Sequence, residues 1–292
     1  MAERVRIVEV GPRDGLQNDT VAVSVDMRIA FIEKLIAAGL TSIEAGSFVS
    51  PKWVPQMADT AGVLRAVARH GGVSFPVLVP NAKGLDDALE AGAREIAIFA
   101  AASETFSQKN INCSIAESFE RFAPVVEKAV SAGVRVRGYV SCVLGCPYEG
   151  RVPLERVVDV SARLSGLGCY EISLGDTIGA GTPRAARSVL KAVSERVPLS
   201  QLAVHFHDPY GQAVANIYAC LEEGVRVVDS SAGGLGGCPY AKGASGNVAT
   251  EDVIYLLDGL GFETGVDRRA VIDASRFIFA TLGKPNPPLR SL

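Results

Sequence analysis

The chain has 292 residues, 48% of them hydrophobic and 21% charged, so it can bury a large core and is neither disordered nor fibrous. A net charge of −3, without a basic run or a basic-aromatic cluster, argues against nucleic acid as a partner. No apolar stretch is long enough to span a membrane, the N-terminus shows no secretion signal, and six scattered cysteines do not suggest a disulfide framework. We therefore expect a cytoplasmic protein with reduced cysteines and no membrane partner.

Short runs rich in β-branched residues alternate along the chain with longer segments of helical periodicity. The short runs predict strands at residues 5–10, 42–45, 75–79, 95–99, 135–141, 170–174, 203–207 and 226–229. The longer segments predict helices that include residues 26–38, 55–70, 114–132, 153–167 and 183–197, and a further helix at 267–282 follows the eighth strand. This alternation is typical of repeated βα units around a parallel sheet.

The number of βα units favours an α/β fold of the closed (β/α)8 TIM-barrel type, with an additional C-terminal helix. An open dinucleotide-binding sheet fits less well, because the first βα turn, residues 11–15, lacks the GxGxxG pattern. No linker or low-complexity segment divides the chain. We expect a single catalytic domain over residues 1–292, with the barrel at about 4–260 and the C-terminal helix and tail at about 267–292.

Two of the three histidines in the chain, His205 and His207, stand two residues apart at the end of the seventh predicted strand. Residues two apart on a strand share one face, so both imidazoles are expected to point at the same place. Two converging imidazoles can hold a metal ion. The alternative is a pair of buried structural histidines.

Polar residues also follow or end the other predicted strands. In a TIM barrel the catalytic groups gather at the C-terminal ends of the strands, so these side chains can be considered together. They are Arg13 and Asp14 after the first strand, Glu44 in the second, Asn81 near the third, Ser103 and Glu104 after the fourth, and Asp176 and Thr177 after the sixth.

A glycine-rich segment follows the eighth strand, with six glycines between residues 233 and 246. Such a segment indicates unusual backbone angles, close approach to a ligand, or a loop that must move. Cys238 and Asn247 stand in or beside it, which argues against a mere flexible linker. A thiol on a moving loop could approach a substrate and transfer a proton.

The candidate ligands form a mixed nitrogen and oxygen set. The imidazoles of His205 and His207, with the carboxylate of Asp14 and the amide oxygen of Asn247, suit Mg²⁺, Mn²⁺, Co²⁺ or Zn²⁺ and leave positions for a substrate. Arg13 beside this set could stabilise an oxyanion in the transition state. Its alternative is an Arg13–Asp14 ion pair on a solvated turn.

Two further carboxylates, Glu44 and Asp176, have two interpretations. They could orient Arg13 and the ligand histidines, or they could be ordinary carboxylates at the mouth of the barrel.

Four segments together resemble the 3-hydroxy-3-methylglutaryl-CoA (HMG-CoA) lyase family, part of a broader group of metal-dependent barrel lyases and condensing enzymes. They are residues 10–18, 47–57, 205–208 and 234–241, and the resemblance spans nearly the whole chain. It implies that the metal, with Mg²⁺ or Mn²⁺ expected, is bound by Asp14, His205, His207 and Asn247. One departure is Pro209, where related sequences often have Thr.

The resemblance also implies that Arg13 and Cys238 are catalytic, and Glu44 and Asp176 match family positions near the reacting groups. We expect these residues, with His205, to form the catalytic set. The implied reaction cleaves HMG-CoA to acetyl-CoA and acetoacetate, in leucine degradation and ketone-body formation. Arg13 would stabilise the enolate oxygen, and Cys238 would deliver a proton to the acetyl-CoA carbon. The general base stays open between His205, Asp14 and a water molecule. The implied partner is a small acyl-CoA substrate, bound by a homodimer.

Three other functions are compatible with the sequence. One is a barrel condensing enzyme of the isopropylmalate or homocitrate synthase type, which joins acetyl-CoA to a 2-oxo acid. Another is a lyase for a different 3-hydroxyacyl-CoA, because one or two methylenes in a pocket change selectivity by only about 1–3 kcal/mol. The third is a barrel that binds metal and acyl-CoA without turnover. The residues that contact CoA are not identified, since the sequence has no P-loop and no clear basic cluster.

Overall fold

The computed structural model describes residues 3–236 and 246–285. Within these residues, eight parallel strands form one sheet in the order β1-β8-β7-β6-β5-β4-β3-β2. The strands are β1 Arg6–Glu9, β2 Gly46–Ser47, β3 Val77–Leu78, β4 Glu95–Ala101, β5 Arg135–Ser141, β6 Glu171–Asp176, β7 Leu202–Phe206 and β8 Val227–Ser230.

The first and last strands of this order meet, so the sheet closes into a barrel. Glu9 of β1 forms a parallel bridge with Ile43, just before β2. The amide of Glu9 donates to the carbonyl of Ser42, and the amide of Glu44 donates to the carbonyl of Glu9, each over 2.9 Å. The predicted TIM barrel is confirmed.

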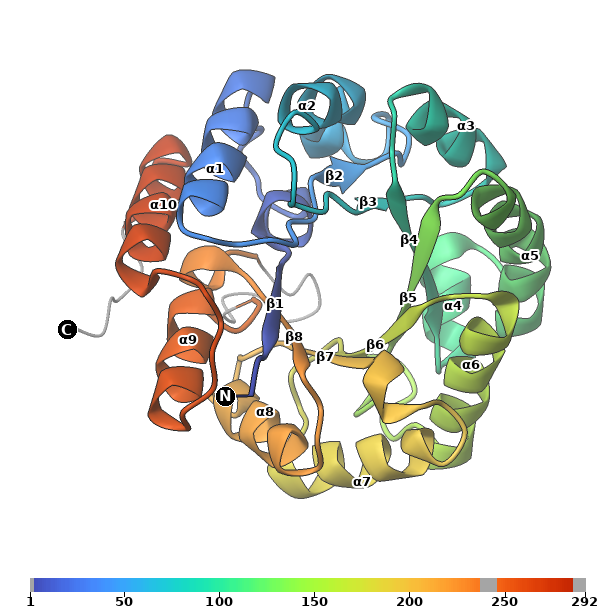
Figure 1. The fold of residues 1–292 in the computed structure, drawn as a ribbon. Helices are drawn as coiled ribbons and strands as arrows, with labels where there is room; N and C mark the ends of the chain where they lie inside the picture. The colour runs from blue at the N-terminus through green and yellow to red at the C-terminus, as the bar shows by residue number, and fades with distance from the viewer. Residues whose placement is uncertain (1–2, 237–245, 286–292) are drawn as a thin grey trace.

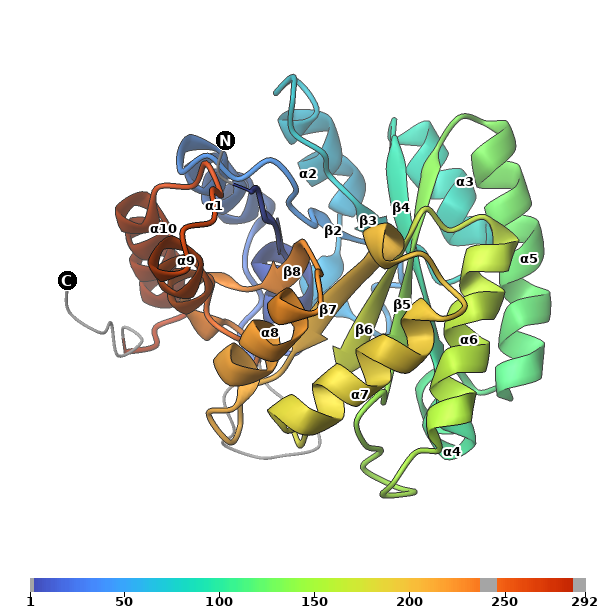
Figure 2. The same ribbon diagram turned by 60° about the horizontal axis from the view of Figure 1, so that its bottom comes forward.

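Helices surround the strands on the outside, as the view along the barrel shows (Figure 1). They are α1 Val25–Ala37, α2 Thr60–Val67, α3 Ala82–Glu90, α4 Glu104–Ile111, α5 Ile115–Ser131, α6 Leu154–Leu167, α7 Pro183–Ser194, α8 Ala213–Glu222, α9 Thr250–Gly259 and α10 Arg268–Thr281. The turned view shows α5, α6 and α7 along the outside of the barrel wall (Figure 2). None of the helices in the described ranges is long and apolar enough to cross a membrane.

Local sequence explains where these helices begin and which face they bury. At α5, the Ser114 side chain accepts from the amide of Glu117, whose carboxylate accepts from the amide of Ser114, so a capping box starts the helix. Phe119, Phe122 and Val126 then recur at helical spacing and are buried in the core. The predicted C-terminal helix is α10, which packs against α1 (Figure 1).

Two predicted elements differ from the structure. Residues 42–45 do not form one continuous strand; Ser42 and Ile43 make isolated bridges, and the ladder of β2 begins at Gly46. The amide of Ala45 donates to the carbonyl of Pro76, but Pro76 has no N–H to return a bond, so the ladder is interrupted there.

The single helix predicted at residues 55–70 is two helices. A 3-10 turn at Pro55–Met57 is followed by α2, which starts at Thr60. Between them Asp59 adopts a left-handed conformation, with φ of 52°, and its carboxylate accepts from the amide of Gly62 as the N-cap of α2. Asp59, a short acidic residue, therefore separates the 3-10 turn from α2 and caps the start of α2.

Candidate metal centre and active site

His205 and His207 both point into the barrel at the C-terminal end of β7. His205 lies within the strand and His207 directly after it, and their ring centroids are 5.2 Å apart. Nδ1 of His205 is 3.2 Å from Oδ2 of Asp229, and Nδ1 of His207 is 3.0 Å from the main-chain oxygen of Asp176. A carboxylate and a carbonyl only accept, so each neutral ring carries its proton on Nδ1 and keeps the Nε2 lone pair free.

Asp14 completes a group of three metal-ligating side chains. It lies on a π-helical turn, Gly11–Gly15, that directly follows β1 and sits at the same mouth of the barrel. One ligand atom each from Asp14, His205 and His207 lie within 4.8 Å of one another, and Oδ2 of Asp14 is 3.9 Å from Nε2 of His207. One carboxylate and two imidazoles with free lone pairs form a possible metal-binding site.

The charges in this group act on each other. Burial opposes ionisation of Asp14, but Arg13 and His207 overcome it and hold the pKa of Asp14 well below its usual value. Burial would lower the pKa of His207, yet the nearby carboxylate of Asp14 raises that pKa instead. Asp14 is therefore ready as an anionic ligand, whereas a metal at His207 competes with a proton.

Asn247 lies beside Asp14. Its backbone forms a bridge with His207, and its Nδ2 donates to Oδ2 of Asp14 over 2.9 Å and to the carbonyl of Leu235 over 3.2 Å. To serve as a metal ligand, the amide has to turn so that Oδ1 takes the place of Nδ2. The structure thus brings Asn247 to the predicted site, with its donor side facing the carboxylate.

Arg13 is buried and clamped between two carboxylates. Its Nε donates to Oε2 of Glu44 over 2.6 Å, its Nη1 donates to Oδ1 of Asp14 over 2.7 Å, and the guanidinium lies 5.5 Å from the centre of the Tyr139 ring. Burial would lower the pKa of Arg13, but Glu44 and Asp14 raise it. Arg13 is therefore a buried, fixed cation beside the three candidate ligands, and its pair with Asp14 is not a surface ion pair.

Two buried carboxyl oxygens in this region have no hydrogen-bond partner among the described residues. They are Oε1 of Glu44 and Oδ1 of Asp176. Burial raises the pKa of each carboxyl group, despite Arg13 beside Glu44 and the amide of Gly181, which donates to Oδ2 of Asp176 over 2.8 Å. Two open acceptors at the end of the barrel fit a bound cation or a substrate hydroxyl.

Other polar residues near the strand ends have local roles. Asn81 caps α3 and Ser103 caps α4, while Glu104 accepts from the amide of Ile115. The Thr177 hydroxyl accepts from the amide of Cys142. These contacts explain their presence after the strands without a part in the chemistry.

The glycine-rich segment begins and ends beside the ligands. A Cβ built on Gly246 would lie 2.4 Å from the carbonyl carbon of Gly236, so the two glycines are in direct backbone contact. A Cβ on Gly236 would likewise meet Asn247 and Gly15. The predicted catalytic Cys238 lies outside the described residues.

The sequence analysis missed Asp229, Arg137 and Tyr139, which lie inside the barrel next to the predicted set. These residues could have been noticed as polar side chains inside buried strands. Asp229 follows two valines in β8, and Arg137 lies in the middle of β5. A charge in a buried strand has to be paired, and the partner is not visible in the local sequence.

A TIM barrel with an aspartate, two histidines and an arginine at the C-terminal mouth places this protein in the class of barrel enzymes with a possible metal-binding site. The model of the HMGL-like family matches residues 4–278. A protein of Pseudomonas aeruginosa named 3-hydroxy-3-isohexenylglutaryl-CoA/hydroxy-methylglutaryl-CoA lyase is 59% identical over 286 residues, which cover 98% of this chain and 95% of that protein. The chain belongs to the HMGL-like family.

Solved structures agree with this assignment. The crystal structure of hydroxymethylglutaryl-CoA lyase from Pseudomonas aeruginosa has a TM-score of 0.96 and 58% identity, covering 99% of this chain and 96% of that one. An HMG-CoA lyase from Acinetobacter baumannii, solved with coenzyme A and 3-methylmalate, has a TM-score of 0.93 and 37% identity, covering 98% of this chain and 93% of that one.

Proposed function

We propose that this protein is a carbon–carbon lyase that cleaves HMG-CoA to acetyl-CoA and acetoacetate. The observation that carries the proposal is 59% identity, over nearly the whole of both chains, to a protein named as a lyase of this substrate. The relative solved with coenzyme A supports an acyl-CoA substrate. The group formed by Asp14, His205 and His207, with Arg13 beside it, supplies the chemistry that this reaction needs.

The proposed cofactor is a divalent metal, Mg²⁺ or Mn²⁺, held by Asp14, His205, His207 and Asn247. A metal bound there would supply Lewis acidity toward the oxygen atoms of the substrate. Four ligands from the protein, namely one carboxylate, two imidazoles and one amide oxygen, would leave positions for the substrate. The ion pair between Asp14 and Arg13 holds the Asp14 carboxylate in place from the other side.

Arg13 is proposed to stabilise the enolate oxygen that forms as the C2–C3 bond breaks. Its guanidinium is already fixed by Glu44 and Asp14, so no reorganisation is required when negative charge appears on the thioester oxygen. Glu44 then acts by positioning Arg13, through the 2.6 Å bond to Nε. The electrostatic attraction between a guanidinium and a developing negative charge is stronger in a buried site than at the surface, because the effective dielectric constant is lower there.

The acceptor of the hydroxyl proton stays open between His205, Asp14 and a water molecule, and we add Asp176 as a further candidate. Nδ1 of His205 faces Asp229, and its Nε2 is proposed as a metal ligand, so this ring cannot accept a proton while it binds the metal. Asp176 has a buried oxygen without a partner among the described residues and a raised pKa, both of which suit proton transfer. If His205→Gln retains full turnover, the catalytic assignment of His205 is wrong.

Cys238 is proposed to protonate the acetyl-CoA carbon after cleavage. Support comes from its place in the glycine-rich segment, whose described ends at Gly236 and Gly246 lie against the Asp14 and Asn247 region. The proton has to come from a thiol, since a thiolate has none to give. Cys238→Ser should lower turnover by about 100-fold or more, as for the loss of a general acid, and unchanged turnover would remove Cys238 from the mechanism.

A second candidate substrate has a longer acyl chain. The similar Pseudomonas aeruginosa protein is named for 3-hydroxy-3-isohexenylglutaryl-CoA as well as for the methyl compound. A condensing enzyme of the isopropylmalate or homocitrate synthase type is the remaining alternative.

One panel of assays separates these functions. The protein is incubated with HMG-CoA, with 3-hydroxy-3-isohexenylglutaryl-CoA, and with acetyl-CoA plus 2-oxo acids, and acetyl-CoA, acetoacetate and free CoA are measured. We expect acetoacetate from HMG-CoA and no free CoA from the third mixture. Release of CoA only in the third mixture would reassign the protein to the condensing enzymes.

We further propose a single domain, a homodimer and a cytoplasmic location. The cysteines at residues 113, 142, 146, 169 and 220 are free thiols in the structure, which suits a reducing compartment. The homodimer rests on the resemblance to the lyase family, and light scattering of the purified protein tests it.

A further inference from the structure

A layer of charged side chains crosses the inside of the barrel beneath the three metal-ligating residues. Asp229 of β8 lies in it, 1% exposed, opposite His205 in the register of β7 and β8. Its Oδ2 faces Nδ1 of His205 at 3.2 Å and accepts from the Ser173 hydroxyl at 2.8 Å. This carboxylate is the only side-chain partner that the described residues give to Nδ1 of His205.

Arg137 of β5 holds the Asp229 carboxylate in a fixed plane. Its Nη1 donates to Oδ2 over 3.0 Å and its Nη2 to Oδ1 over 2.7 Å, a bidentate pair. Arg137 is itself 1% exposed, and its Nε donates to Oε1 of Glu171 over 2.7 Å, while its Nη1 also donates to the Tyr139 hydroxyl. Neither the guanidinium nor the carboxylate can rotate without losing several of these bonds.

Such a buried network is not explained by stability alone. Desolvation of a buried ion pair offsets much of its attraction, and apolar residues of similar volume often replace such pairs without loss of stability. An arginine, two carboxylates and an imidazole inside a barrel therefore need a further reason. The contact with His205 supplies one, because a carboxylate behind a ligand histidine fixes its tautomer and its orientation.

We propose that Asp229, clamped by Arg137, is the positioning residue for His205. It holds the proton on Nδ1 and turns Nε2 toward Asp14 and His207, so that the three ligand atoms converge before a metal arrives. This inference rests on the proposed metal site but not on the identity of the substrate. His207 needs no such side chain, because the main-chain oxygen of Asp176 performs the same task.

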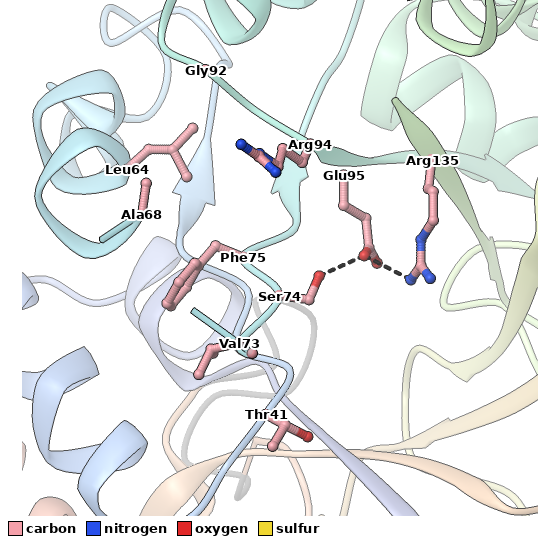
Figure 3. A pocket seen from close by; sticks show the side chains of 11 residues that line it. Thr41, Leu64, Ala68, Val73, Ser74, Phe75, Gly92, Arg94, Glu95 and Arg135 are labelled. Carbon is pink, nitrogen blue, oxygen red and sulfur yellow. Dashed lines mark hydrogen bonds and ion pairs between the residues drawn. The ribbon is translucent and has the colours of Figure 1, made fainter. Parts of the chain in front are cut away.

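The chain offers a matched control in Glu95, the first residue of β4. Glu95 is also buried, at 4% exposure, and it binds an arginine, a serine and a tyrosine, namely Arg135, Ser74 and Tyr170. It lines a pocket, where its carboxylate meets Ser74 and Arg135 (Figure 3). Because Glu95 begins β4, it lies at the N-terminal end of the strand, whereas the metal-ligating group follows the C-terminal ends of β1 and β7. Glu95→Gln therefore removes a buried carboxylate from its arginine, serine and tyrosine partners without touching His205, although Arg135, unlike Arg137, is exposed.

The test compares Asp229→Asn with Glu95→Gln in metal-stripped protein. Mn²⁺ binding is measured by calorimetry, and the tautomers are measured by NMR of ¹⁵N-histidine-labelled protein, which has only three histidine side chains. We expect Asp229→Asn to weaken Mn²⁺ binding by about 10- to 100-fold, and Glu95→Gln to change it by less than about 3-fold. At pH about 9, where ordinary histidines are neutral, the native spectrum should show His205 with its proton on Nδ1, and the Asp229→Asn spectrum should lose that single tautomer.

Equal Mn²⁺ affinity of folded Asp229→Asn and the native protein, with the same His205 tautomer, would overturn the proposal. If Asp229→Asn fails to fold, the native spectrum still decides, because a His205 proton on Nε2 would overturn it alone. A failed lyase assay with tight, Asp229-dependent Mn²⁺ binding would refute the proposed reaction and leave this inference standing.

Discussion

The proposed chemistry depends most directly on the contacts of Arg13. A lysine in its place keeps the charge but offers a single ammonium instead of a planar fork, so it cannot hold both Glu44 and Asp14 with the same geometry. We expect Arg13→Lys to lower kcat and kcat/KM together by about 100- to 1,000-fold, the usual loss for an oxyanion donor. Steady-state kinetics with HMG-CoA provide the measurement.

Arg28 is the matched control for this substitution. It is equally buried and donates to the carbonyl of Ala58 and the hydroxyl of Thr60, away from the metal-ligating group. Arg28→Lys should change stability more than kcat. If both lysine variants lose kcat to the same extent, Arg13 has no special part in the transition state.

At the residue scale, sequence analysis identified those site residues whose spacing or adjacency in the chain indicates a shared location. His205 and His207 share a strand face by their spacing, and Asp14 and Arg13 are adjacent in the chain. It could not assign the tautomers of the histidines, because their partners Asp229 and Asp176 come from other strands. It left open whether the Asp176 side chain orients the ligand histidines, and the structure places the main-chain oxygen of Asp176 beside Nδ1 of His207.

At the element scale, Glu9 connects three segments at the C-terminal end of the barrel through hydrogen bonds. It is the last residue of β1 and fully buried; its Oε1 accepts from the amides of Gly11 and Ala232, over 2.8 and 2.9 Å, and its Oε2 accepts from the Thr250 hydroxyl over 2.7 Å. Burial raises the pKa of Glu9 to about 7, although these three donors oppose the shift. The carboxyl therefore links the turn of Asp14, the segment after β8, and α9.

The raised pKa predicts a pH dependence of stability. Between about pH 4.5 and pH 7 the unfolded chain has lost the Glu9 proton and the folded protein retains it, so ionisation favours unfolding and the free energy of unfolding falls as pH rises. Glutamine cannot ionise but keeps an oxygen for the two amides. As pH rises from 4.5 to 8, we expect the free energy of unfolding of Glu9→Gln to increase by up to about 3 kcal/mol relative to that of the native protein.

Urea unfolding of both proteins across this range measures the difference. Glu120→Gln, on the exposed face of α5, is the control and should run parallel to the native protein. A constant difference between Glu9→Gln and the native protein at every pH would mean that Glu9 ionises alike in the folded and unfolded chains.

Element boundaries were predicted well where the chain itself carries the signal. The capping box of Ser114 and Glu117 starts α5 within one residue of the predicted start, and the apolar spacing that follows continues to Ser131. The interrupted second strand was not predicted, because the missing N–H is that of Pro76, which directly precedes β3. The break at Asp59 was missed because the apolar pattern continues across it.

At the scale of the whole molecule, the alternation of strands and helices was sufficient to predict the barrel. Closure depends on the bonds of Glu9 to Ser42 and Glu44, which are far from Glu9 in sequence. These bonds join the first strand of the sheet order to the last one. The same closure brings Arg13 to Glu44 and so completes one side of the proposed active site. Fold and site are therefore linked through the first two strands.

The central claim is metal-dependent cleavage of HMG-CoA at the group formed by Asp14, His205 and His207. Its most direct test measures acetoacetate from HMG-CoA with the protein stripped of metal by a chelator, then supplied with Mg²⁺ or Mn²⁺. The account predicts no turnover after stripping, recovery with either ion, and no recovery for His207→Ala at the same ion concentrations. Full turnover by the stripped protein, or by His207→Ala, would contradict it.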